Sequence, residues 1–250
     1  MAGPARFALS LFGGVQLLDP DGRAVERVLA QPKLVGLLAY LAVPVVGQFR
    51  RRDTVVGALW PELDQAHARA ALRKAVHTLR TILGADAVLP RGDEDIALSA
   101  DHLWCDVAAF TAAAEAAQLA QALEWYRGDL MPGFHLAECG EFDRWLEEER
   151  ASARERAQAA AWALAQRFEG DEQLSAAAQW ARRAARFSWS DERALRRALG
   201  MLDRLHDRAG AVRLYEEFAR RLRADLEIEP SAETIALVDR IRGTPPLRRP

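Results

Sequence analysis

The chain has 250 residues, half of them hydrophobic and 28% charged, so it can bury one large core or two small ones. Its strongest apolar run, residues 34–46, is interrupted by Gly36 and Pro44 and is too short for a membrane span, and the first residues lack the charged-then-apolar pattern of a signal segment. We therefore expect a globular cytoplasmic protein without a membrane partner.

Catalytic and metal-binding patterns are absent from the sequence. The two cysteines, Cys105 and Cys139, have no close histidine or cysteine partner, which argues against a disulfide framework or a metal cluster. Phosphate loops, nucleophile elbows and zinc-protease motifs are also missing. We predict no enzymatic activity, no metal and no cofactor.

The first third of the chain mixes strand and helix patterns. Alternating β-prone residues over 7–19, followed by a turn at 19–22 and residues 24–28, predict a small antiparallel sheet. Leucines at helical spacing predict a helix over residues 34–42. A short helix is expected from Val55 to Trp60, with Asp53 or a neighbour as its cap.

After a connector over residues 62–68, a helix is predicted over residues 69–83, with one apolar side and one basic side. The apolar side consists of Leu72, Val76, Leu79 and Leu83. The opposite side carries no carboxylate and consists of Ala70, Lys74, His77, Thr78 and Thr81, with Arg73 and Arg80 along one edge. Such a face suits phosphates and base edges, although an ordinary surface helix can also present a solvated basic side.

Two short strands around the polar tip 91–95 predict a hairpin over residues 87–98, with a further strand at 103–105. Sheet, helices and hairpin in this order are typical of a winged helix-turn-helix, in which one helix enters the major groove and the hairpin is the wing. Residues 50–81 contain seven basic and three acidic residues, so this region is basic although the chain as a whole has a net charge of −2.

Three runs of sequence resemble a known family. They are Gln31-Pro32-Lys33 with residues 37–41, Arg52-Asp53 with residues 58–61, and Ala71-Leu72 with residues 76–80 and Leu83-Gly84. Together they resemble the OmpR-type winged-helix domain of the antibiotic-regulatory activators known as SARPs. In that family a bacterial transcriptional activation domain of tetratricopeptide-like helices follows directly, and the resemblance implies the same order here.

The remainder of the chain reads as nearly all helical, with one long helix over residues 141–168. An internal repeat is visible, because four packing residues recur 34 residues later, which is the tetratricopeptide period. The pairs are Ala177 with Ala211, Trp180 with Leu214, Ala181 with Tyr215, and Ala184 with Phe218. Tryptophans 125, 145, 162 and 180 are expected in the core of this helical array.

The predicted fold class is therefore mainly α, an N-terminal α+β winged helix-turn-helix followed by an all-α tetratricopeptide-like repeat domain. The expected boundaries are 1–105 for the winged helix, 106–242 for the activation domain and 243–250 for a tail. In the closing segment, Glu227 stands where the resembling family usually has glycine, so the turn before the last helix is expected to differ.

The predicted DNA contacts combine the basic helix face with the start of the preceding helix. They are Arg52, Arg69, Arg73, Lys74, His77, Thr78 and Arg80. Arg80 could instead pair inside the domain, and of Arg50, Arg51 and Arg52 only one is expected to reach a phosphate. The carboxylates Asp93-Glu94-Asp95 at the wing tip would repel a phosphate backbone, which leaves open whether the wing contacts DNA.

Two functions fit these features. The first is a transcriptional activator that binds double-stranded promoter DNA through the helix over residues 69–83 and, as the resemblance implies, contacts RNA polymerase or a second copy of itself through its helical repeats. The second is a protein-interaction adaptor whose winged helix no longer binds DNA strongly, for which the acidic wing is the sequence support. Salt-dependent DNA affinity distinguishes them.

Overall fold

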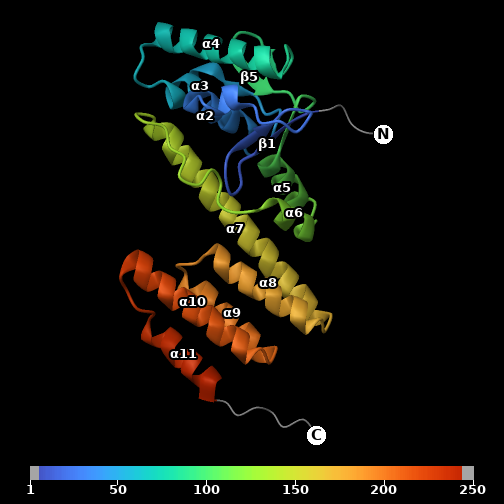
Figure 1. Cartoon of the computed structure of the whole chain (residues 1–250), viewed down its shortest axis with the longest axis vertical. Helices are drawn as coiled ribbons and strands as arrows, with labels where there is room; N and C mark the ends of the chain where they lie inside the picture. The colour runs from blue at the N-terminus through green and yellow to red at the C-terminus, as the bar shows by residue number, and fades with distance from the viewer. Residues whose placement is uncertain (1–5, 244–250) are drawn as a thin grey trace. The chain divides into compact units, whose positions relative to one another are not determined.

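The structure is a computed structural model and describes residues 6–243 (Figure 1). This part of the chain is mainly helical, with eleven helices and six short strands, which confirms the predicted fold class. The chain divides into two compact units, residues 1–153 and residues 154–250. The strands that the structure describes all belong to the first unit. Helix α7 (Gly140–Gly170) confirms the long helix and contributes residues to both units. Of the tail predicted at 243–250, residues 244–250 lie outside the described residues.

The strands of the first unit form two three-stranded sheets, in the orders β2-β1-β6 and β3-β5-β4. Their bounds are β1 Phe7–Ser10, β2 Gln16–Leu18, β3 Arg50–Arg51, β4 Val88–Arg91, β5 Asp95–Leu98 and β6 Leu103–Cys105. All pairings are antiparallel except that of β1 with β6, which is parallel. The β4–β5 hairpin is the predicted one, whereas the pairing of β3 with β5 was not expected.

The prediction of a strand over residues 24–28 is wrong. Only Ala24 pairs, through a single bridge to Leu18, and the helix α1 (Glu26–Leu29) begins directly afterwards. This helical turn buries Val28 completely. Burial of the one large apolar side chain therefore outweighs the strand preference of the short segment.

The helices of the first unit surround the sheets. Besides α1 and the first part of α7 they are α2 Pro32–Ala42, α3 Arg52–Leu59, α4 Gln65–Leu83, α5 Asp106–Glu115 and α6 Leu119–Trp125. Helix α2, predicted from its leucines, is buried at every position from Leu34 to Ala42 and forms the centre of the core. Figure 1 shows α4 on the outer side of α3, so one face of α4 points to solvent.

Two helix starts differ from the predictions. Helix α3 begins at Arg52, and Asp53 lies in its first turn without capping it. Helix α4 begins at Gln65 because the Asp64 carboxylate accepts hydrogen bonds from the backbone N–H groups of Ala66 and His67, both at 3.0 Å. The expected connector over residues 62–68 is consequently shorter, and the solvent-facing helix gains one turn.

The apolar stripe of α4 is confirmed, because Leu72, Val76, Leu79 and Leu83 are all buried. Ala75 is buried as well, so it belongs to the packed side of α4 and not to the exposed face. A helix whose stripe packs this completely has only one orientation relative to the core. The exposed face is therefore fixed in direction.

The junction between β1 and α5 is held by a buried carboxylate. Asp106, only 3% exposed, accepts hydrogen bonds from the backbone N–H of Leu11 at 2.9 and 3.1 Å and of Phe12 at 3.1 Å. Burial raises the pKa of Asp106, while these hydrogen bonds act in the opposite direction. This side chain thus fastens the end of β1 to the first turn of α5.

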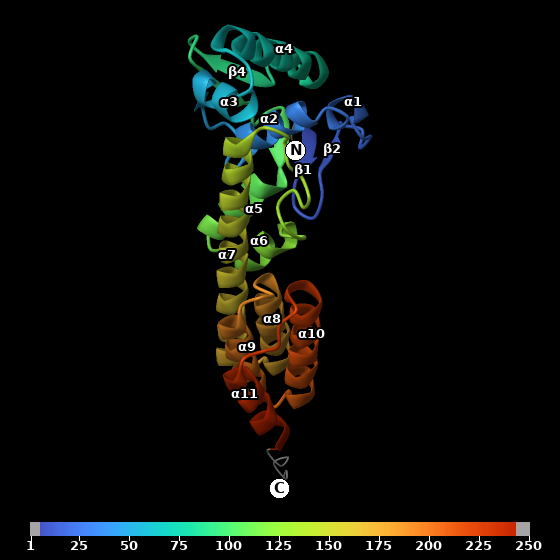
Figure 2. The ribbon, with the colours of Figure 1, turned by 90° about the vertical axis from the view of Figure 1, so that its left-hand side faces the viewer.

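The second unit consists of packed helices joined by short turns. After the C-terminal part of α7 they are α8 Leu174–Phe187, α9 Glu192–Arg204, α10 Arg208–Leu226 and α11 Ala232–Gly243. Figure 1 and Figure 2 show α8, α9 and α10 side by side. The residues that predicted the repeat lie on α8 and α10, where Ala177 and Ala211 are buried at equivalent positions.

The same turn recurs at the predicted period. Glu172 after α7 and His206 after α9 have left-handed φ angles of 58° and 60°, and they stand 34 residues apart. In each turn the next residue donates its N–H to a carbonyl five positions earlier, Gln173 to Phe168 at 2.8 Å and Asp207 to Leu202 at 2.9 Å. This is the Schellman arrangement that ends a helix and starts the next one at a fixed angle. It confirms a helical repeat.

Three of the four tryptophans assigned to the repeat core do not fill it. Trp162 is buried in the second unit, whereas Trp180 is only half-buried. Trp125 and Trp145 lie in the first unit, where their rings pack on Trp104 at 4.9 Å and on Tyr40 at 4.6 Å between centroids. Those partners are about 20 and 105 positions away, which spacing along a helix cannot reveal.

The last helix is held by Glu192 at the start of α9. Its carboxylate accepts a hydrogen bond from the backbone N–H of Ser231 at 3.0 Å and also from the hydroxyls of Ser231 and Thr234. Burial acts to raise the pKa of Glu192, but these hydrogen bonds outweigh it and the pKa is lowered. Before this helix, Glu227 has a left-handed φ of 57°, so the conformation that glycine favours is kept without glycine.

Candidate nucleic-acid interface

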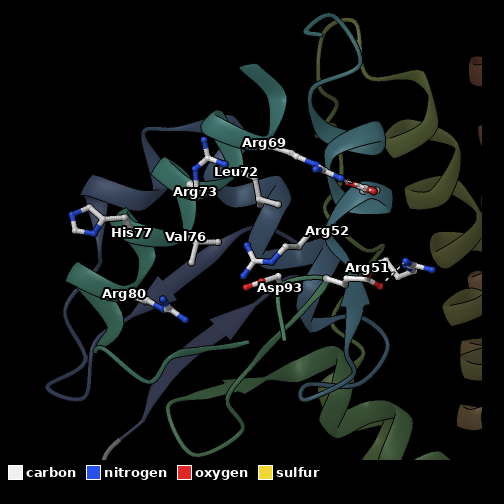
Figure 3. Close-up of a pocket in the computed structure, with 11 residues that line it drawn as sticks. Arg51, Arg52, Arg69, Leu72, Arg73, Val76, His77, Arg80 and Asp93 are labelled. Atoms are coloured by element: carbon white, nitrogen blue, oxygen red, sulfur yellow. Dashed lines mark hydrogen bonds and ion pairs between the residues drawn. The ribbon is translucent and has the colours of Figure 1, made fainter. Parts of the chain in front are cut away.

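A cleft of about 620 Å³ lies between α3, α4 and the tip of the β4–β5 hairpin (Figure 3). It is lined by Arg51, Arg52, Asp53, Arg69, Leu72, Arg73, Val76, His77, Arg80, Asp93 and Glu94. Five of the seven predicted DNA contacts are in this set, whereas Lys74 and Thr78 lie on the α4 surface beyond it. The structure therefore brings most of the predicted site together.

The three consecutive arginines point to different partners. Arg50 turns inward, where its Nη2 donates to the Val43 carbonyl at 2.7 Å and its guanidinium lies 4.5 Å from the centre of the Tyr40 ring. Arg51 turns to the tip of the β4–β5 hairpin and forms an ion pair with Glu94 at 2.7 Å. Arg52 lines the cleft. Since β3 ends at Arg51 and α3 begins at Arg52, the change from strand to helix separates these side chains.

Arg52 is a partly buried cation among other cations. Its Nε is buried and has no hydrogen-bond partner within residues 6–243. Burial lowers the pKa of Arg52, the neighbouring Arg80 and Arg73 lower it further, and Asp93 acts in the opposite direction. Figure 3 shows the Asp93 side chain beside the Arg52 guanidinium. An anion entering the cleft would meet converging positive charge.

Arg69 and Arg80, at the two ends of this face, hold the domain together. Arg69 forms a bidentate ion pair with Asp53 of α3, with distances of 2.8 and 3.0 Å from its Nη2 to the two carboxylate oxygens. Arg80 donates from Nε and Nη2 to the Val88 carbonyl, at 3.1 and 2.7 Å, and so binds β4 to α4. Both side chains line the cleft, but each already has a partner.

Arg73, Lys74 and His77, in the middle of α4, are exposed and lack such partners. No ion pair or side-chain hydrogen bond engages them in the part of the chain that the structure describes. Thr78, next to them, uses its hydroxyl to donate to the Lys74 carbonyl at 3.0 Å. The helix therefore presents two unpaired cations and an imidazole to solvent from one exposed face.

The tip of the β4–β5 hairpin, predicted to be a wing, is acidic, and two of its three carboxylates form ion pairs. Glu94 pairs with Arg51, and Asp95 pairs with Arg91 at 2.7 Å. Asp93 and Glu94 both line the cleft, a position that sequence reasoning missed. The pairing of β3 with β5, which places Arg51 opposite Asp95, brings this tip to the arginines. A signal for it was the pair of short charged runs, one basic and one acidic, each next to a strand.

Other kinds of site are not evident in the described residues. Between residues 6 and 243, no three histidine, cysteine or carboxylate side chains come together as a potential metal site. None of the helices in this range is both long and apolar enough to cross a membrane. The buried Cys105 thiol has its pKa raised to about 12 by burial, which leaves it protonated and unreactive at neutral pH.

The chain is similar in fold to a solved structure and in sequence to a known protein family. The solved structure of Mycobacterium tuberculosis EmbR in complex with a low-affinity phosphopeptide shares the fold, with a TM-score of 0.59 and 22% sequence identity over 97% of this chain. The chain spans 66% of the EmbR chain. No curated protein sequence matches it. The family model "Bacterial transcriptional activator domain" matches residues 105–242, more than half of the 250 residues, and the chain therefore belongs to the bacterial transcriptional activator domain family.

Proposed function

We propose that this protein is a transcriptional activator of the SARP type, whose OmpR-type winged helix binds double-stranded promoter DNA. Its tetratricopeptide-like helices would contact RNA polymerase or a second copy of the chain. Membership of the bacterial transcriptional activator domain family supports the general role, and the EmbR-like fold is compatible with it. Neither this proposal nor the alternative below includes a catalytic step.

The observation that carries the DNA-binding proposal is the unpaired charge on α4. Arg73, Lys74 and His77 are exposed on one helix whose opposite face is fully packed, so their direction is set by the core. Side chains with hydrogen-bond donors on a fixed helix are what major-groove recognition requires. Arg52 adds a cation from the preceding helix in the adjacent cleft, in a position suited to a phosphate.

The proposal is tested by binding of the full chain to genomic DNA fragments at several salt concentrations. We expect selected fragments to bind, to share a sequence element and to lose affinity in the Lys74→Ala, His77→Ala double variant. Arg27→Ala is the matched control, because Arg27 is an exposed cation of the first unit outside the cleft. Equal binding by the double variant would exclude α4 as the DNA-reading helix.

The alternative is an adaptor whose winged helix has lost strong DNA binding. One observation favours it, since Glu94 and Asp93 offset the charge of Arg51 and Arg52 in the cleft. DNA binding through phosphates weakens steeply as salt rises. An adaptor would show no measurable DNA affinity even at low salt and would instead retain its protein partners when Lys74 and His77 are replaced.

A further inference from the structure

We infer that the acidic wing tip, Asp93 and Glu94, competes with DNA phosphates for the arginines of the cleft and so suppresses sequence-independent binding. This inference rests on the proposed DNA-binding function and assigns a selectivity element within the same site. The wing would then act as an internal substitute for phosphate on this side of α4.

Glu94 is paired with the guanidinium of Arg51. Its Oε2 lies 2.7 Å from Nη2 of Arg51, a distance typical of a charge-assisted hydrogen bond. Both side chains are largely exposed, at 67% and 73%, on the rim of the cleft. A phosphate that approached Arg51 would have to displace the carboxylate from the guanidinium.

Asp93 faces Arg52 in the cleft. Its negative charge raises the pKa of Arg52 against the effects of burial and of the neighbouring arginines. Figure 3 shows the Asp93 carboxylate pointing to the Arg52 guanidinium. Since the Nε of Arg52 is buried without a hydrogen-bond partner among residues 6–243, Asp93 stands where a phosphate oxygen would otherwise enter.

Backbone hydrogen bonds hold these carboxylates in place. Arg52 donates its backbone N–H to the Glu94 carbonyl at 2.7 Å, and Arg51 pairs with Asp95 in the β3–β5 ladder. The wing tip is thus joined by main-chain hydrogen bonds to the segment that carries the arginines. The carboxylates meet these arginines through the register of the sheet and not through a chance surface encounter.

The acidic tip pairs with some of the cations at the cleft and leaves others unpaired. Exposed ion pairs contribute little to stability, so DNA can break them, but each broken pair reduces the gain from neutralising a phosphate. Arg73 and Lys74 lie on α4 and are not paired with the wing. Sequence-independent affinity is therefore reduced while base contacts from α4 stay available, which raises the ratio of specific to non-specific binding.

The test uses the full chain, mixed-sequence double-stranded DNA and two salt concentrations, about 50 and about 200 mM. The variant Asp93→Asn, Glu94→Gln removes two charges with nearly isosteric side chains. We expect it to bind on the order of tenfold more tightly at the lower salt and to show a steeper salt dependence. The control Glu26→Gln, Glu115→Gln removes two exposed charges of the first unit outside the cleft and should change binding little.

A second comparison separates competition from long-range repulsion. Glu94→Gln should strengthen binding in the wild-type background but not in an Arg51→Ala background, because the arginine that Glu94 occupies is then absent. If Glu94→Gln helps equally in both backgrounds, the carboxylate only repels DNA at a distance and the inference is wrong. Far-UV circular dichroism of each variant confirms that the chain is folded.

The outcomes also separate this inference from the proposed function. If the wild type binds DNA and the wing variant binds equally or more weakly, DNA binding stands and competition by the wing is refuted. If the wild type fails to bind but the wing variant binds, competition is supported in its strongest form. If neither binds at low salt, both the DNA-binding function and the role of the wing are refuted.

Discussion

Removal of the unpaired cations of α4 should flatten the salt dependence of DNA binding. We consider the double variant Arg73→Ala, Lys74→Ala, because both side chains are exposed and neither has a partner within residues 6–243. Their loss breaks no interaction inside the domain, so stability should be almost unchanged. Any change in affinity then reports contact with DNA.

The magnitude follows from counterion release. Each phosphate contact contributes about 0.9 to the slope of log affinity against log salt, so two lost contacts reduce its size by about 1.8. Between about 50 and about 200 mM salt, the wild-type affinity should therefore fall about tenfold more than that of the variant. The slopes are measured by fluorescence anisotropy on one selected DNA fragment.

Arg69→Ala is the comparison that makes this measurement decisive. Arg69 is also a cation of α4, but its guanidinium is committed to Asp53 on α3. We expect its removal to change the slope much less than removal of Arg73 and Lys74. If all three substitutions change the slope equally, pairing inside the domain does not decide which cations meet DNA, and the assignment of the interface is refuted.

Three further predictions concern stability. Asp106→Ala should lower the free energy of unfolding by about 3 kcal/mol, since it leaves the buried N–H groups of Leu11 and Phe12 without an acceptor; chemical denaturation measures it. Glu227→Gly should raise the midpoint of thermal unfolding, because it relieves a left-handed conformation that costs a residue with a side chain about 1 kcal/mol. Glu192→Gln should destabilise the second unit at neutral pH but not at acidic pH. Because the pKa of Glu192 is lowered in the folded state, its carboxylate contributes fully to the free energy of unfolding above the ordinary glutamate pKa, and this contribution is lost as the pH falls through the lowered pKa. Chemical unfolding at several pH values measures the difference between the variant and the wild type.

Each of these predictions has an outcome that contradicts it. Wild-type stability of the Asp106 variant would show that another group or water satisfies the N–H donors. An unchanged midpoint for Glu227→Gly, compared with an exposed helical substitution such as Glu216→Ala, would show that the turn relaxes without strain. A stability difference for Glu192→Gln that persists at acidic pH would place its effect in packing and not in charge.

Periodicity was sufficient to predict the buried side of α4. Leu72, Val76, Leu79 and Leu83 recur at helical spacing, and all four are buried because a single packed stripe determines how a helix lies. The start of the same helix was missed, since Asp64 caps it through side-chain hydrogen bonds that no apolar pattern records. Local pattern thus predicted the packing of this helix better than its extent.

Contacts between distant residues explain what sequence reasoning missed at the site. Glu94 lies 43 positions from Arg51, and it meets that side chain only because β3 pairs with β5. A strand of two arginines has no alternation by which it could be predicted. The charge of the wing was therefore visible in the sequence, whereas its pairing with the cleft arginines was not.

The three arginines of α4 show how the fold assigns different tasks to similar side chains. Arg69, Arg73 and Arg80 are spaced by four and seven residues, so they lie along one edge of the helix. At one end of this edge α3 supplies Asp53 to Arg69, and at the other end β4 supplies the Val88 carbonyl to Arg80. Arg73 lies between these neighbours and lines the cleft, where the described residues supply no partner. Under the proposed function, the charge available to DNA is the one that the domain itself leaves unneutralised. A substitution that gave Arg73 an internal carboxylate partner should then weaken binding as much as its removal does.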